Sequence, residues 1–471
     1  MIPVVQHDIR RVFIANRGEI AVRIIRACRS LGMETVAGVS EADVESRAAR
    51  MANQYVVLGQ PPASESYLKI ANLIRAARDS GCDAVHPGYG FLSERSAFAR
   101  ACADAGLIFI GPTPDAIDAM GDKITAVGLA AKAGVPRVPG SGALPDPDAA
   151  RKVAADIGYP VLLKATSGGG GRGMRVVRAE DEVEAAFKSA ASEAQSAFGD
   201  ATLYVEKFIE KARHIEIQVM GDQHGNVVHL GERECSTQRR HQKLIEEAPS
   251  PFLSSEMRAQ MGEAAVGLAR NVGYFGAGTI EFVVDDSDGK FYFLEMNTRI
   301  QVEHPVTEEV TDRDLVAEQI RVACGLPLSF SQQDITLEGH AIECRINAED
   351  PDKNFLPRPG LIHQWQPPSG QGVRLDTHCH AGYTVPPYYD SLIAKLIVHA
   401  PTRAEAIAQM RRALSEFHIG GPATTIAFHQ AVLGHDDFAA GRVTTRWVED
   451  IFIPARKLAL DAATAATEVQ S

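Results

Sequence analysis

Short apolar runs alternate with segments of helical spacing along the first part of the chain. Residues 12–15 form an apolar run that predicts a strand, and apolar residues recur at helical spacing between 20 and 31. The pattern continues with a helix near 67–80 and with strands at residues 35–39, 84–85 and 107–110. Strands that alternate with helices are typical of a parallel, doubly wound sheet. We therefore predict an α/β N-terminal domain over residues 1–121.

A stretch rich in proline and glycine, residues 136–147, predicts a linker into a second, smaller domain. The elements expected there are a helix near 180–195 and strands at residues 161–164, 174–177 and 203–206. From about residue 208 apolar and polar positions alternate over longer segments, which predicts an antiparallel sheet. The expected domains after the first are therefore residues 122–208, an α+β domain over 209–456, and a tail over 457–471.

The composition limits the classes of protein that this chain can represent. A formal net charge of −12 argues against a general nucleic-acid-binding protein. No apolar run is long enough for a membrane span, and the N-terminal residues do not resemble a signal peptide. The 7 cysteines are dispersed without a CxxC pair, as in proteins that keep reduced thiols. We expect a cytoplasmic enzyme that binds neither membrane nor nucleic acid.

The most conspicuous motif is the glycine-rich segment 164–174, KATSGGGGRGM. It lacks the Gly-Lys-Ser/Thr of a Walker A loop and joins two predicted strands, so it is expected to form a hairpin loop. Glycines leave backbone N–H groups accessible to an anion, which favours phosphate binding over a merely flexible surface loop. The first strand–helix turn has a single glycine, Gly18, rather than GxGxxG, which argues against a dinucleotide-binding domain.

A second motif alternates polar and apolar residues from Phe293 to His304. If this segment is extended, one face carries Glu295, Asn297, Arg299, Gln301 and Glu303. The dipeptide at 288–289, Asp-Gly, predicts a hairpin that places Glu281 opposite Glu295. Two carboxylates and an amide oxygen are ligands suited to Mg²⁺, so we favour a metal site over a solvated edge strand.

Two further segments concentrate charge. Residues 232–243 hold several arginines and Lys243, which fits either a solvated charge run or a pocket for an anionic substrate. Residues 340–347 alternate as a strand that places Glu343 and Arg345 on one face. Such an arginine can stabilise an oxyanion, although a structural salt bridge is equally compatible with the pattern.

Together these motifs resemble the biotin carboxylases, a family of ATP-grasp enzymes. The resemblance covers about residues 10–455, and its motifs lie at residues 14–21, 86–94, 120–123, 164–174, 238–243, 295–305, 343–350 and 388–391. It implies that 122–208 is the ATP-grasp lid carrying the glycine hairpin, and that 209–456 is a C-terminal catalytic domain. Alternatives that stay open are another ATP-grasp carboxylate ligase, such as a carbamoyl-phosphate synthase, and a non-catalytic protein that binds ATP for regulation.

The resemblance also implies site residues. ATP is expected to contact Lys123, Lys164, Gly168, Gly169, Gly170, Gly171, Glu206, Lys207, Ile209, His214, Gln238 and His241. Mg²⁺ or Mn²⁺ is expected at Glu281, Glu295 and Asn297, and bicarbonate at Lys243, Arg299, Gln301 and Val302. The biotin pocket is expected at Arg345, His241, Tyr89 and Gly90. The implied catalytic residues are Glu303, Arg299, Arg345 and Lys243.

In the implied mechanism Glu303 is the general base that activates bicarbonate for attack on the γ-phosphate of ATP. Carboxyphosphate then breaks down to CO₂ and phosphate, the phosphate deprotonates biotin, and Arg345 stabilises the biotin enolate. Because carboxyphosphate hydrolyses in water, a closing glycine lid would protect it.

The partner proteins that we expect depend on a biotin-attachment dipeptide that this sequence does not contain. No methionine is followed by lysine, the dipeptide at which biotin is attached, so we expect biotin on a separate carrier protein and a separate carboxyltransferase. The resemblance implies a homodimer, but Ser30 replaces an acidic residue that some relatives use at that contact. The expected final acceptor is acetyl-CoA, as in fatty acid biosynthesis, with pyruvate, 2-oxoglutarate or another acyl-CoA as alternatives.

Overall fold

The computed structural model describes residues 4–166 and 173–458. The predictions for Gly168–Gly171 and for the end of the tail lie outside these residues. The described chain forms two compact units: unit 1 comprises Met1–Val135, Arg213–Val283 and Leu294–Ser471, and unit 2 comprises Pro136–Ala212 and Val284–Phe293. The domain boundaries predicted from the sequence remain predictions.

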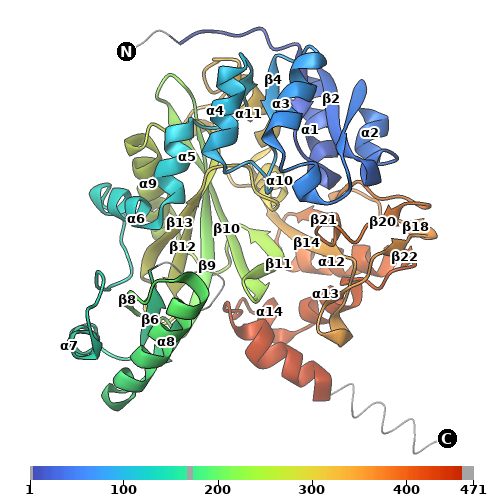
Figure 1. Ribbon diagram of the computed structural model, residues 1–471. Coiled ribbons are helices and arrows are strands. Elements are labelled where there is room, and N and C mark those ends of the chain that lie inside the picture. Colours follow the sequence, from blue (N-terminus) through green and yellow to red (C-terminus); the bar gives the residue numbers. More distant parts are fainter. Residues whose placement is uncertain (1–3, 167–172, 459–471) are drawn as a thin grey trace, which may run out of the picture. The chain divides into compact units, whose positions relative to one another are not determined.

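The N-terminal part of unit 1 is a parallel sheet with helices, drawn from blue to cyan in Figure 1. Its strands, in the sheet order β3-β2-β1-β4-β5, are β3 (Gln54–Gly59), β2 (Glu34–Ser40), β1 (Arg11–Ile14), β4 (Ala84–His86) and β5 (Ile108–Phe109). Its helices are α1 (Gly18–Ser30), α2 (Arg47–Met51), α3 (Ile70–Asp79), α4 (Ser96–Asp104), α5 (Pro114–Gly121) and α6 (Lys123–Lys132). All its strand pairs are parallel, which confirms the predicted doubly wound pattern. The sequence pattern missed β3, whose edge position leaves Tyr55 and Val57 exposed.

Unit 1 also contains most of an eight-stranded sheet, and the hairpin that joins the first two strands of this sheet is assigned to unit 2. In sheet order the strands are β13 (Phe291–Asn297), β12 (Gly276–Asp285), β9 (Ala212–Gly221), β10 (Val227–Arg239), β11 (Gln242–Ala248), β14 (His340–Asn347), β21 (Leu392–Ala400) and β19 (Val373–Thr377). From β9 to β19 neighbouring strands are antiparallel, as the alternating pattern predicted.

Helices cover this sheet and carry the connections between its strands. They are α9 (Ser255–Asn271), α10 (His304–Thr311), α11 (Leu315–Ala323), α12 (Arg403–Glu416), α13 (Ile426–Leu433) and α14 (Asp436–Ala439). Short two-stranded sheets pair β15 (Glu349–Asp350) with β16 (Leu356–Pro357), β17 (Gly360–Leu361) with β20 (Thr384–Val385), and β18 (Gln364–Gln366) with β22 (His418–Gly420). No helix of the described residues is long and apolar enough to cross a membrane.

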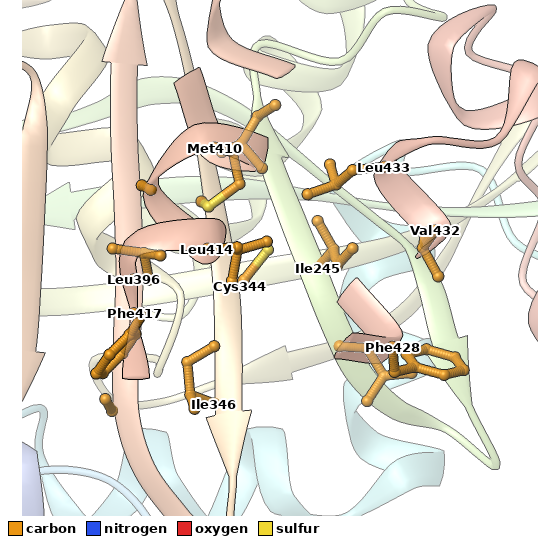
Figure 2. Packing of buried hydrophobic residues seen from close by; sticks show 14 of the residues in the cluster. Ile245, Cys344, Ile346, Leu396, Met410, Leu414, Phe417, Phe428, Val432 and Leu433 are labelled. Atoms are coloured by element: carbon orange, nitrogen blue, oxygen red, sulfur yellow. The ribbon is translucent and has the colours of Figure 1, made fainter. Parts of the chain in front are cut away.

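One face of β14 and β21 packs into the largest apolar core of unit 1. Cys344, Ile346 and Leu396 contribute from the strands, and Met410 and Leu414 contribute from α12 (Figure 2). Thr402 is the N-cap of α12, because its hydroxyl accepts a hydrogen bond from the backbone N–H of Glu405. Alternation along β14 therefore sends its other residues, Glu343 and Arg345, to the opposite face of the sheet.

Unit 2 contains a small antiparallel sheet in the order β7-β6-β8. Its elements are α7 (Pro147–Ile157), β6 (Val161–Ala165), β7 (Met174–Val177), α8 (Val183–Phe198) and β8 (Leu203–Lys207). Lys164 pairs with Met174, so the glycine-rich segment connects two antiparallel strands as predicted.

Candidate active site

The Lys243 ammonium group lies at the centre of a cluster of carboxylates in unit 1. Its Nζ atom is 2.6 Å from Glu216, 2.6 Å from Glu303 and 3.0 Å from Glu281. Burial alone would lower the pKa of Lys243, but the carboxylates of Glu216 and Glu303 outweigh it and hold that pKa well above its ordinary value. Lys243 is therefore a fixed positive charge among acidic groups that converge from two strands and from the N-terminus of α10.

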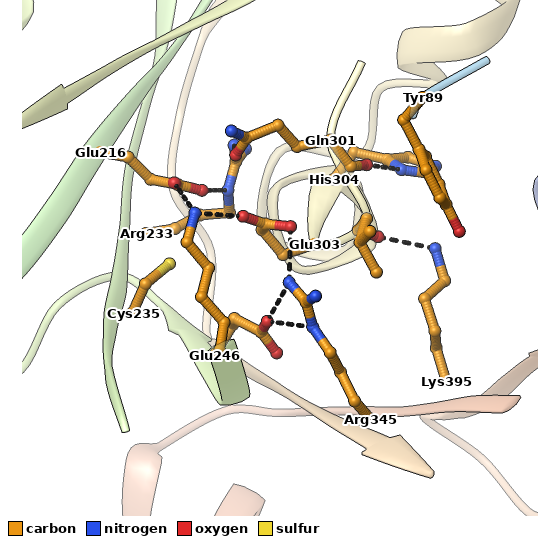
Figure 3. Close-up of polar contacts among 12 residues, drawn as sticks. Tyr89, Glu216, Arg233, Cys235, Glu246, Gln301, Glu303, His304, Arg345 and Lys395 are labelled. Carbon is orange, nitrogen blue, oxygen red and sulfur yellow. Dashed lines mark hydrogen bonds and ion pairs between the residues drawn. The ribbon is translucent and has the colours of Figure 1, made fainter. Parts of the chain in front are cut away.

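Glu303 connects this lysine to Arg345. One carboxylate oxygen of Glu303 accepts from Lys243, and the other accepts from Nη2 of Arg345 at 2.9 Å (Figure 3). Burial would raise the pKa of Glu303, but Lys243, Arg345 and Arg233 together hold it well below the ordinary range. The carboxylate is therefore ionised at neutral pH, in the form that can accept a proton.

Arg345 lies between two buried glutamates of unit 1. Its Nε donates to Glu246 at 2.6 Å, while Nη2 reaches Glu303. Burial, together with the negative charge of Glu303, raises the pKa of Glu246 to about 7, against the opposing charge of Arg345. Glu343 is fully buried on the same face, and neither carboxyl oxygen has a hydrogen-bond partner among the described residues. Glu343 and Arg345 thus lie on one face of β14, as predicted, and both belong to a dense cluster of acidic and cationic side chains.

The segment that precedes Glu303 is not the extended strand that alternation predicted. Strand β13 ends at Asn297, and Glu303 is the N-cap of α10. Pro305 does not keep His304 extended, because proline is compatible with the first turn of a helix and α10 begins at His304. The side chains converge nevertheless, because the chain turns back between Asn297 and Glu303.

Glu281 is the acceptor around which this turn closes. Asn297 and Gln301 each donate a side-chain amide to Glu281 Oε1 at 3.0 Å. Arg299 donates to the Asn297 side chain at 2.9 Å and to Glu94 at 2.9 Å. The structure thus brings together Glu281, Asn297, Arg299 and Gln301, as the spacing predicted, but it uses a loop for part of the segment.

The predicted metal ligands fit a divalent cation in their donor chemistry. Burial and the charges of Lys243 and His214 act in opposite directions on Glu281, and its pKa is held well below the ordinary range. Partial burial and the charges of Glu281 and Glu94 raise the pKa of Glu295, so its ionised form is destabilised by neighbouring negative charge. A cation shared by Glu281, Glu295 and the amide oxygen of Asn297 would relieve that repulsion.

Predicted ATP-binding residues of unit 1 lie in three places. His214 Nε2 lies 3.0 Å from Glu281, and Gln238 Nε2 lies 3.4 Å from His214 Nδ1, so these two belong to the cluster. Lys123 is exposed at the first residue of α6, next to its N-cap Asp122. His241 is exposed at the tip of the β10–β11 hairpin, with a φ of 64°. Among the described residues, the side chains of Arg345 and Tyr89 hydrogen-bond to glutamates and not to His241.

Other predicted ATP-binding residues belong to unit 2. The ammonium of Lys164 donates to the Glu206 carboxylate at 2.8 Å. Lys207 donates to the backbone carbonyls of Gly158 and Tyr159, each at 3.0 Å. Ile209 is almost fully buried just beyond β8. Lys164 thus has a carboxylate partner on the neighbouring strand.

Tyr89 and Gly90 lie on the loop that follows β4. The side-chain amide of Asn16 donates to the carbonyls of Pro87 and Tyr89, each at 2.7 Å, and so fixes this loop. The Tyr89 hydroxyl donates a short hydrogen bond to Glu19 on α1. Gly90 has a φ of +68°, a conformation that disfavours other residues.

Glu216 and Arg233 belong to the cluster, although the sequence did not predict them as site residues. Glu216 shares its strand face with His214, so alternation along β9 could have indicated it. Arg233 is fully buried and donates to Glu216 and Gln218, which a charge-rich segment does not reveal by itself. Cys235 lies beside Glu216 and Glu303, and burial raises the pKa of its thiol, which fits an inert sulfhydryl.

Comparison with known families decides between the candidate ligases. Residues 8–117 match the biotin carboxylase N-terminal domain, and residues 343–450 match the biotin carboxylase C-terminal domain. Residues 122–331 match the ATP-binding domain of the carbamoyl-phosphate synthase L chain. The chain belongs to the biotin carboxylase family. It is an ATP-dependent ligase of that family, as the sequence motifs predicted.

Individual relatives agree over almost the whole chain. Biotin carboxylase 1 of Bacillus subtilis (strain 168) is 54% identical over 442 residues, which are 94% of this chain and 98% of the relative. One of the pyruvate carboxylase subunits of Methanothermobacter thermautotrophicus is 53% identical over 93% of this chain and 89% of its own. A dimer of the biotin carboxylase domain of 2-oxoglutarate carboxylase from Hydrogenobacter thermophilus, with ADP, magnesium and bicarbonate, superposes with a TM-score of 0.87. It is 49% identical over 94% of this chain and 98% of its own. The predicted fold class is confirmed by such neighbours.

Proposed function

We propose that this protein carboxylates biotin on a carrier protein, using ATP and bicarbonate, in the first half-reaction of a biotin-dependent carboxylase. The observation that carries the proposal is the buried Glu303 carboxylate, held between Lys243 at 2.6 Å and Arg345 at 2.9 Å. An ionised base between two cations is suited to take the proton of an anionic substrate that those cations bind.

Bicarbonate is assigned to Lys243, Arg299, Gln301 and Val302. The two cations counter its charge, and Gln301 offers an amide beside Glu281. Glu303 removes the bicarbonate proton while a bicarbonate oxygen attacks the γ-phosphorus of ATP and ADP leaves. The product is carboxyphosphate, and the proton stays on Glu303 until it is released.

ATP is assigned to Lys123, Lys164, Gly168–Gly171, Glu206, Lys207, Ile209, His214, Gln238 and His241, of which only the glycines lie outside the described residues. A Mg²⁺ or Mn²⁺ ion would be held by Glu281, Glu295 and Asn297 and would neutralise charge on the ATP phosphates. The repulsion between Glu281 and Glu295 supports this assignment. The glycine hairpin is proposed as the lid that keeps water from carboxyphosphate.

Biotin is assigned to the surroundings of Arg345, with Tyr89, Gly90 and His241. Carboxyphosphate breaks down to CO₂ and phosphate, and that phosphate removes the ureido proton of biotin. The Arg345 guanidinium then stabilises the resulting enolate, which attacks CO₂. Arg345 is fixed by Glu246 on one side, so its guanidinium is oriented before substrate binds.

We further propose a homodimer that works in the cytoplasm with a biotin carboxyl carrier protein and a carboxyltransferase. Acetyl-CoA is the acceptor that we favour, which would place the protein in fatty acid biosynthesis. Subunits of pyruvate and 2-oxoglutarate carboxylases resemble this chain to a similar degree, so these acceptors are the alternatives.

The test measures ADP release by the purified protein with ATP, Mg²⁺ and bicarbonate, with and without free biotin. Stimulation by biotin that depends on bicarbonate is the expected result. A protein that releases ADP at the same rate with and without biotin would contradict the proposal. Adding each candidate carboxyltransferase with its carrier and acyl acceptor would then identify the second half-reaction.

A further inference from the structure

Lys395 is a completely buried lysine that the proposed mechanism does not use. It lies on β21, directly opposite Arg345 on β14 and opposite Asp376 on β19. Cross-strand partners point to the same face of a sheet, so Lys395 reaches the face on which Arg345 and Glu343 lie. Figure 3 shows its ammonium group beyond Arg345, on the side toward Tyr89.

The ammonium group of Lys395 holds the main chain immediately before Glu303. Its Nζ donates to the backbone carbonyl of Val302 at 2.6 Å and lies 3.1 Å from Glu19 Oε1. A buried ion pair contributes little to the stability of the fold, since apolar residues of similar volume often replace such pairs without a loss of stability. The contact with Val302 points instead to a role in positioning.

Both peptide groups that flank Val302 are fixed by buried side chains. The carbonyl of Gln301 lies 2.7 Å from Nδ1 of His304, and the carbonyl of Val302 accepts from Lys395. In a trans peptide the N–H points away from the carbonyl, so the N–H groups of Val302 and Glu303 are oriented as well. No acceptor in residues 4–166 and 173–458 takes either N–H. They are therefore free to bind an anion beside Lys243 and Arg299.

The same lysine is connected to the loop assigned to biotin. Glu19 Oε1, which lies next to Lys395, also accepts the hydrogen bond of the Tyr89 hydroxyl. The second oxygen of Glu19 has no partner among the described residues, so this carboxylate is held through one atom by two donors. A chain of contacts thus runs from Val302 through Lys395 and Glu19 to Tyr89.

We infer that Lys395 is a positioning residue that orients the Val302 peptide for bicarbonate and, through Glu19, fixes Tyr89 at the biotin side of the site. This inference rests on the proposed function. Lys395 is not itself assigned to a substrate, but it contacts Val302, which is assigned to bicarbonate. We therefore expect it to affect the binding and alignment of bicarbonate and not the binding of ATP.

The test replaces Lys395 by methionine, which keeps much of the length of the side chain and removes its donors. We expect the KM for bicarbonate to rise about tenfold or more, because a small misplacement of a binding group is costly. The KM for ATP should change by less than about twofold, since the described residues that Lys395 contacts, Val302 and Glu19, are not assigned to ATP. Stimulation of ADP release by free biotin should also fall.

Arg403→Met is the matched control. Arg403 is a largely buried cation that bonds Glu247 at 2.6 Å and the backbone carbonyls of Phe438 and Ala439, far from the assigned substrate residues in sequence. The Arg403→Met substitution should lower the melting temperature, but the ratio of the KM for bicarbonate to the KM for ATP should not change. A Lys395→Met protein that is folded and has an unchanged bicarbonate KM would overturn the inference, as would equal increases in both KM values.

If Lys395→Met does not fold, Lys395→Gln carries the same comparison, because glutamine keeps a donor but has a shorter reach. A rise in the bicarbonate KM alone supports the inference, and an unchanged value overturns it. The two proposals fail separately. Absence of biotin-stimulated ADP release in the unaltered protein contradicts the proposed function. If the unaltered protein shows that stimulation and the Lys395 variants keep its KM for bicarbonate, only the positioning role is contradicted.

Discussion

The two faces of β14 have opposite chemistry. Ile342, Cys344 and Ile346 point into an apolar core with α12 and α13. Glu343 and Arg345 alternate with them on the opposite face, and Arg345 points into the acidic and cationic cluster of Figure 3. One strand therefore supplies packing on one side and chemistry on the other.

The difference teaches where the strand gains stability. Burial of apolar area on the first face contributes about 25 cal/mol per Å². On the second face buried charges lose their hydration, and their mutual attraction repays that loss only in part. Burial and the charge of Glu246 raise the pKa of Glu343 well above its usual range, against the charge of Lys395. We expect changes on the polar face to affect turnover and changes on the apolar face to affect stability.

The largest expected effect follows from Glu303→Gln on the polar side. This change keeps the size of the side chain and removes the carboxylate between Lys243 and Arg345. The rate of biotin carboxylation should fall about 10²–10⁴-fold, because a positioned general base contributes that much. Isothermal titration should show nearly intact ATP binding, and comparable carboxylation by the variant would remove Glu303 from the base role.

Phe428→Ala tests the apolar side. Phe428 lies on α13, is buried in the core that α13 shares with α12, and packs edge-on against Phe355 and Phe452. Truncation of a buried phenylalanine lowers the free energy of unfolding by about 3–5 kcal/mol. Urea denaturation measures this loss, and the KM values of the folded fraction at low temperature should stay unchanged. A selective loss of bicarbonate binding would break the separation between the two faces.

Glu246→Gln tests the polar face of β14 through the pH dependence of stability. The pKa of Glu246 is raised to about 7 in the folded protein, above its ordinary value of 4.5. The folded state therefore binds this proton more tightly, so the contribution of Glu246 to stability is full at low pH and is lost as the pH rises from about 4.5 through about 7. As the pH rises through that window, the unaltered protein should lose free energy of unfolding relative to Glu246→Gln, by at most about 3 kcal/mol. A constant difference between pH 5 and pH 8 would show that Glu246 does not titrate there.

The sequence predicted the two faces of β14 because strict alternation determines which side chains share a face. It also identified Glu281, Asn297, Arg299 and Gln301 as neighbours, although the strand ends at Asn297. It could not predict Lys395 or Glu246, because their positions depend on which distant strands become neighbours in the sheet. The turn before α10 was also missed, since alternation over a short segment does not distinguish a strand from a loop.

The smallest expected effect concerns the cap of the helix that covers the apolar face. The Thr402 hydroxyl accepts from the backbone N–H of Glu405 at 3.3 Å, at the first turn of α12. Thr402→Ala removes this acceptor and should lower the free energy of unfolding by about 1 kcal/mol. Thr402→Ser keeps a hydroxyl and is the matched control. Because α12 packs on the apolar side of β14 and β21, kcat and both KM values should not change. A change in bicarbonate KM for the alanine variant but not for the serine variant would mean that strain in the apolar core reaches Arg345 through the strand.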